Sequence, residues 1–65
     1  MDSVQKARIR LQHWISHNAH HLEEYEELVK ELEQHGKTES AIFVKEMIEL
    51  TSRSTESLKK ALELL

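Results

Sequence analysis

The sequence predicts an all-α fold, an antiparallel two-helix hairpin that dimerises into a four-helix bundle. The composition favours helix, because the 65 residues include one glycine and no proline, with 38% hydrophobic and 32% charged residues. Apolar residues recur at alternating steps of three and four on both sides of Gly36, which is the spacing of packed helices. Each half also carries apolar residues outside this repeat, so that one hairpin leaves apolar surface uncovered.

The first helix is expected over about residues 3–35. Asp2 and Gln5 have the spacing of a capping box, in which side chains bond to the free N–H groups at a helix start. The repeat that follows has two polar steps, Arg8 and Asn18, and otherwise consists of Val4, Leu11, Ile15, Leu22, Tyr25, Val29 and Leu32. Gly36 predicts the end of this helix, because glycine readily adopts the left-handed conformation that terminates helices.

The second helix is expected over about residues 38–65, with Thr38 as its N-cap and Glu39 favourable in its first turn. Its repeat consists of Ala41, Val44, Ile48, Thr51, Thr55, Leu58, Leu62 and Leu65. A loop of about three residues makes the two helices antiparallel. If the chain turns at Gly36, Asn18 lies opposite Thr55 in a polar layer at the middle of the hairpin. A buried asparagine there would fix the register of the two helices at a cost in stability.

An apolar flank is expected on one side of the hairpin. It comprises Trp14, Leu28, Phe43, Met47, Leu50 and Leu64. The opposite side, the polar flank, carries Gln5, Gln12, Glu26, Glu33, Lys45, Ser52 and Lys59. Because two helices cannot cover the apolar flank, we expect a symmetric homodimer; a heterologous helical partner, a trimer or a tetramer are alternatives.

Size and charge restrict the classes of function. Residues 1–65 form one domain at most, too small to bury a large core alone. The absence of cysteine excludes disulfides and is compatible with the cytoplasm, where we expect the protein. The net charge of −3 gives no overall attraction to nucleic acid. No apolar stretch approaches the roughly 18 residues of a membrane span, and charges interrupt residues 1–16, unlike a signal peptide.

Four of the five histidines lie within nine residues of the first helix: His13, His17, His20 and His21. His13, His17 and His21 recur every four residues, so they share a helical face with Glu24. Imidazole and carboxylate ligands suit a divalent transition metal such as zinc, nickel or iron. His17 and His21 could instead be interface polar residues that hydrogen-bond Glu24, Ser54 or Ser57, while His13 and His20 are expected to face solvent. A response to pH is the third possibility.

The stretch from His13 to Tyr25 resembles a group of small, uncharacterised prokaryotic helical-hairpin domains with an HWxxHNxxHxxEY pattern. The matching positions are His13, Trp14, His17, Asn18, His21, Glu24 and Tyr25. The resemblance covers about a fifth of the chain and implies no activity. It favours a site over mere packing, because the histidines of the pattern include the three that recur every four residues.

These features predict a non-enzymatic, self-associating helical module. The alternative is a small metal-binding or metal-handling protein that uses the histidine cluster at the dimer interface. An enzyme is not expected, because the sequence has no cysteine nucleophile, no phosphate-binding loop and too little chain to enclose a substrate. Only a dinuclear metal site at the centre of the dimer would make an enzymatic function plausible.

Overall fold

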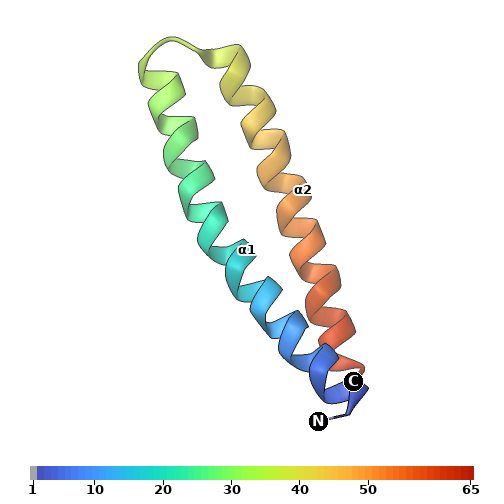
Figure 1. The fold of residues 1–65 in the computed structure, drawn as a ribbon. Helices are drawn as coiled ribbons and strands as arrows, with labels where there is room; N and C mark the ends of the chain where they lie inside the picture. Colours follow the sequence, from blue (N-terminus) through green and yellow to red (C-terminus); the bar gives the residue numbers. More distant parts are fainter. Residues whose placement is uncertain (1) are drawn as a thin grey trace.

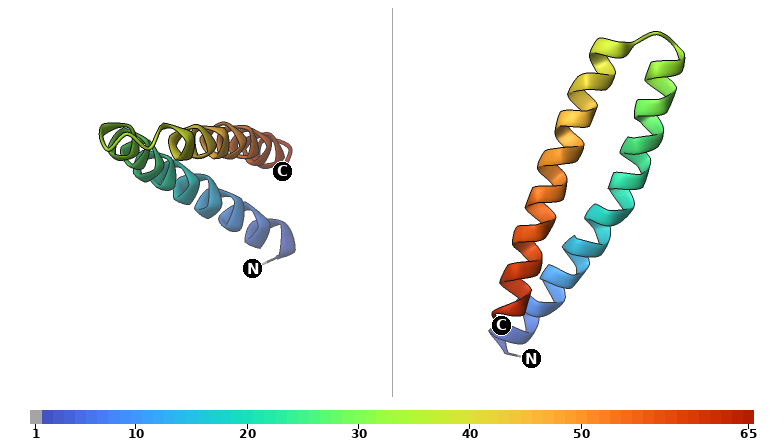
Figure 2. Two further views of the ribbon diagram at one scale, coloured as in Figure 1. Left: turned by 90° about the horizontal axis from the view of Figure 1, so that it is seen from above. Right: turned by 180° about the vertical axis from the view of Figure 1, so that it is seen from behind.

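The computed structural model describes residues 2–65 as two α-helices, α1 (Ser3–Gln34) and α2 (Thr38–Glu63). The helices lie side by side and run in opposite directions, with a tight turn at one end and both termini at the other (Figure 1, Figure 2). The hairpin is a rod of 51 × 16 × 12 Å. The predicted all-α two-helix hairpin is therefore confirmed, while Met1, the first residue of the expected domain, lies outside the described residues.

The start of α1 agrees with the prediction. Asp2 is the N-cap, and its carboxylate accepts a hydrogen bond of 2.7 Å from the backbone N–H of Gln5. This bond satisfies one of the four N–H groups that an α-helix leaves without a partner at its start.

Replacing this cap should lower stability by a modest and measurable amount. We expect Asp2→Ala to reduce the free energy of unfolding by about 1 kcal/mol, because the backbone N–H of Gln5 loses its acceptor. Urea denaturation at a fixed chain concentration measures this change. Asp2→Asn is the control, since asparagine keeps the accepting oxygen and should retain most of the stability.

The turn between the helices has a specific glycine-dependent geometry. Gly36 is in the left-handed region, with φ at 72°. Its N–H donates to the carbonyl of Glu33 at 3.1 Å, and the N–H of Lys37 donates to the carbonyl of Leu32 at 2.8 Å. This pair of bonds is a Schellman motif, which satisfies the last carbonyls of α1. The predicted role of Gly36 is thus confirmed.

Three details of the helix ends differ from the sequence predictions. Thr38 is not the N-cap of α2, because its backbone is already helical; Lys37 caps the helix without a side-chain bond. The reason lies in the turn, which makes the Lys37 carbonyl the first acceptor of α2, from the N–H of Ala41 at 3.0 Å. α1 ends at Gln34 rather than at residue 35, and α2 ends at Glu63 rather than at residue 65.

The predicted repeat forms the contact between the helices, here called the seam. Its members between Arg8 and Leu62 are all buried or half-buried, whereas Val4 and Leu65 at the open end are exposed. At the middle of the hairpin, the Asn18 amide donates to the Thr55 hydroxyl at 3.2 Å. That hydroxyl donates to the Thr51 carbonyl at 3.0 Å. The predicted register and polar layer are therefore confirmed.

The two sides of the hairpin differ as the sequence predicts. On the polar flank, the ammonium of Lys45 in α2 lies 3.1 Å from the carboxylate of Glu33 in α1. This pair places the polar flanks of both helices on the same side of the seam, so the apolar flank lies on the other side. Over residues 2–65, neither helix combines the length and the apolar character that crossing a lipid bilayer requires.

Candidate functional site

A ladder of aromatic rings runs along α1. The ring centroids of His13 and His17 are 5.2 Å apart, those of His17 and His21 are 4.8 Å apart, and those of His21 and Tyr25 are 5.9 Å apart. Residues four apart are neighbours on an α-helix surface, which explains why these rings meet in sequence, two pairs stacked and the His17–His21 pair edge-on. The helix therefore brings together the three histidines that the sequence singles out.

Glu24 contacts one histidine of this ladder, His21, and also His20 beside it. One of its carboxylate oxygens lies 3.4 Å from Nδ1 of His21 and 3.4 Å from Nε2 of His20. The contact with His21 agrees with the helical face that the sequence predicts for His21 and Glu24, whereas His20 lies outside that face and its contact is not predicted. The spacing of four between His20 and Glu24 is the sequence signal that could have revealed it. The His20 side chain is nevertheless 72% exposed.

One chain does not by itself assemble the predicted metal-binding set. Within residues 2–65, no group of three or more His, Asp and Glu side chains is arranged to hold a metal ion. The structure pairs Glu24 with His21 and sets the His21 ring edge-on against His17, whereas the ring of His13 stacks on that of His17. Metal binding thus stays a prediction.

The position of His21 connects this cluster with the apolar flank. His21 lies midway in sequence between Trp14 and Leu28, seven residues from each, so all three lie on one strip along α1. His17 and Glu24 occupy the neighbouring strip, further from the seam. His21 is also half-buried, with 39% of its side chain exposed. The cluster therefore borders the surface that the sequence assigns to self-association.

All six residues of the apolar flank are exposed in the single hairpin. Trp14 is 48% exposed, Leu50 is 56% exposed and Phe43 is 70% exposed; Leu28, Met47 and Leu64 are also exposed. Two further large apolar residues, Ile9 and Ile42, are exposed although they belong neither to the repeat nor to the flank. Each follows a seam position by one residue, so both lie toward the outside of the hairpin and away from this flank.

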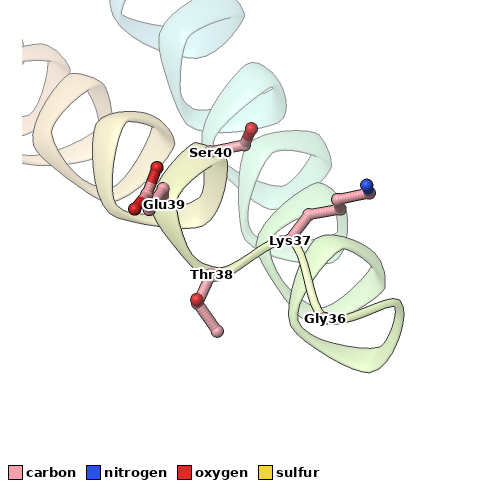
Figure 3. Close-up of a pocket in the computed structure, with 5 residues that line it drawn as sticks. All are labelled: Gly36, Lys37, Thr38, Glu39 and Ser40. Atoms are coloured by element: carbon pink, nitrogen blue, oxygen red, sulfur yellow. The ribbon is translucent and has the colours of Figure 1, made fainter.

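The hollows on the surface lie away from the histidine cluster. One, of about 290 Å³, is formed at the turn by residues 36–40, where the side chains of Lys37 and Glu39 point in different directions (Figure 3). Two shallow grooves, of about 210 and 310 Å³, follow the polar flank beside the seam. Neither groove contains a histidine, so these hollows do not extend the candidate site.

The structure thus offers one surface with two features, an exposed apolar flank and a histidine ladder beside it. Neither a curated protein nor a solved structure matches the chain. A family model described as a domain of unknown function, DUF8180, matches residues 7–65 and so includes the whole ladder and the whole apolar flank. The chain therefore belongs to the DUF8180 family of domains.

Proposed function

We propose that this protein is a self-associating helical module, which forms a homodimeric four-helix bundle through its apolar flank. The observation that carries the proposal is the exposure of all six residues of that flank on one side of the hairpin. Several large apolar residues exposed on one side of a small domain indicate an interaction surface. The simplest partner to cover the flank is a second copy of this chain, because two identical surfaces can pair across a two-fold axis.

The small core of the hairpin supports this proposal. Val29 and Ala41 are the only apolar residues that are buried within residues 2–65. The accessible surface is 5251 Å², whereas a compact monomer of 7.7 kDa exposes about 4,300 Å². The excess of about 900 Å² is close to the roughly 800 Å² that each partner buries in a protein interface of standard size. One partner hairpin is therefore enough to bring the exposed surface into the ordinary range.

Charge favours an antiparallel arrangement of the two hairpins. The half with the termini, residues 2–18 and 55–65, has five basic and three acidic residues, whereas residues 19–54 have four basic and nine acidic residues. A parallel pair would place the two acidic halves together, and like charges in proximity repel. An antiparallel pair places each acidic half against a basic half, so the charges complement one another.

Side-chain size favours the same arrangement. Asn18 pairs with Thr55, and the helices are antiparallel, so three residues further along α1 His21 lies at the level of Ser52, three residues back along α2. An antiparallel dimer with its two-fold axis at this level places Trp14 against the partner's Leu28. In α2 it places a large residue against a small one each time: Phe43 against the partner's Ala61, Met47 against the partner's Ser57, and Leu50 against the partner's Ser54. Alternation of large and small residues is how facing helices interdigitate.

Sedimentation velocity tests the proposed self-association directly. We expect a dimer of about twice the 7.7 kDa chain mass at micromolar concentration, with or without a chelator. A chain that remains monomeric at that concentration would exclude the proposal. A trimer or tetramer would exclude the two-hairpin bundle, because in the proposed dimer a single partner covers the flank.

A further inference from the structure

We propose that the antiparallel dimer builds a binding site for a divalent transition metal from His17, His21 and Glu24 of both copies. This inference rests on the proposed dimer, because one chain alone does not present three suitable ligands within residues 2–65. It goes beyond self-association, since it gives the interface a chemical role at its centre.

The position of His21 is the first step of the argument. The large residues of the α1 flank, Trp14 and Leu28, are placed symmetrically about His21. An antiparallel dimer that pairs these two residues therefore brings His21 next to the partner's His21 at the two-fold axis. A parallel dimer would instead place His21 against α2 of the partner, which presents Leu50 and Ser54 at that level. Only the antiparallel arrangement joins the two histidine ladders.

The ladder already holds its imidazoles close enough for shared coordination. The rings of His17 and His21 are 4.8 Å apart between centroids, and two histidines at this spacing of four are a common chelating pair on helices. Two copies thus supply four imidazoles about the axis. Four nitrogen ligands suffice for a tetrahedral zinc ion, and imidazole also suits nickel and iron.

Glu24 completes the arrangement in one of two ways. Its carboxylate lies 3.4 Å from Nδ1 of His21, where it can accept a hydrogen bond and leave Nε2 of that ring to the metal. Carboxylates that orient metal-bound histidines in this manner raise the basicity of the ligand and fix its tautomer. Alternatively, its exposed oxygen can bind the metal itself. Both roles require the negative charge of Glu24 beside the imidazoles.

The same surface also has a simpler interpretation, in which the histidines only hydrogen-bond polar neighbours across the interface. Ser54 and Ser57 of α2 lie on the side of the hairpin that carries the apolar flank and could serve as such neighbours. The experiment separates the two interpretations by measuring metal binding and oligomeric state in the same samples.

Isothermal titration with Zn²⁺ and with Ni²⁺, followed by native mass spectrometry, tests the site. We expect His17→Ala/His21→Ala to weaken binding by more than about tenfold, because two ligands are lost from each copy. His13→Ala/His20→Ala is the matched control, since it removes two imidazoles of the same cluster from the strip of α1 that faces away from the seam, outside the proposed ligand set. This control should bind Zn²⁺ about as well as the parent; an equal loss in both variants would overturn the assignment.

A third variant shows whether two copies are required. Leu50→Glu is expected to separate the chains while leaving every proposed ligand in place, so it should lose Zn²⁺ binding to a similar extent as His17→Ala/His21→Ala. Unchanged binding by the separated chains would show that the metal needs one copy only and would overturn the shared site. A parent that forms dimers but binds neither Zn²⁺ nor Ni²⁺ would overturn the metal site and leave the proposed dimer intact.

Discussion

Leu50→Glu should convert the dimer into monomers. Leu50 is 56% exposed in the single hairpin and lies on the apolar flank, so the dimer would have to bury the new carboxylate. We expect the dimer to lose about 3 kcal/mol or more, because a buried charge without a partner is strongly unfavourable. Sedimentation equilibrium over a range of concentrations measures this loss. Circular dichroism should show lower thermal stability, because the hairpin alone has a small core.

Ile42→Glu is the matched control for this substitution. Ile42 belongs to the same helix and is 59% exposed, which is nearly the exposure of Leu50. It follows the seam residue Ala41, whereas Leu50 precedes the seam residue Thr51, so the two side chains lie on different sides of α2. Ile42→Glu should leave the dimer unchanged. Equal effects of the two substitutions would mean that the apolar flank is not the interface.

Thr55→Val should destabilise the hairpin itself, through the polar layer at its middle. Valine has nearly the shape of threonine but cannot accept the hydrogen bond of 3.2 Å from the Asn18 amide. Thr55 is buried, so the Asn18 amide would face an apolar group in place of its acceptor. We expect the free energy of unfolding to fall by about 1–2 kcal/mol, since Asn18 is only half-buried and water replaces part of the lost bond. Urea denaturation at fixed concentration measures the change.

The double variant Asn18→Leu/Thr55→Val distinguishes a lost hydrogen bond from a packing defect. It removes both partners, so that no polar group is left without its bond, and its stability should approach or exceed that of the parent. A double variant that is less stable than Thr55→Val would indicate that Asn18 stabilises the fold through other contacts.

Much of the fold could be predicted from the sequence, because its determinants are local. The alternation of three and four residues specifies which face of each helix is packed, and the single glycine specifies where the chain turns. These two facts together also place Asn18 opposite Thr55, which the structure confirms with a hydrogen bond. The cap at Asp2 could be predicted equally well, because a capping bond depends on residues only three apart.

The N-cap of α2 was harder to predict, because it depends on the geometry of the turn. Threonine is a better N-cap than lysine by intrinsic preference. The Lys37 N–H closes the turn by its bond to the Leu32 carbonyl, and the Lys37 carbonyl then accepts from the N–H of Ala41, so Lys37 rather than Thr38 is the N-cap. The geometry of the turn thus overrides the intrinsic capping preference of Thr38.

The candidate site was predictable only in part. The repeat of four residues predicts that His13, His17 and His21 lie along one face of α1, and the structure confirms it: the rings of His13 and His17 stack, and the ring of His21 meets His17 edge-on. The contact between His20 and Glu24 was not predicted, because His20 lies outside the helical face that His13, His17 and His21 share with Glu24. Helical spacing cannot reveal whether ligands converge across two chains, since that depends on the relative direction of the hairpins.

The direction of the two hairpins is therefore the central claim, and a distance between spin labels tests it most directly. The chain has no cysteine, so Lys37→Cys provides a single labelling site at the turn. In the antiparallel dimer the two turns lie at opposite ends, and pulsed electron spin resonance should give a distance of about 45 Å between the labels. A distance below about 20 Å would show parallel hairpins, and an absence of dipolar coupling would show monomers; either result would contradict the account.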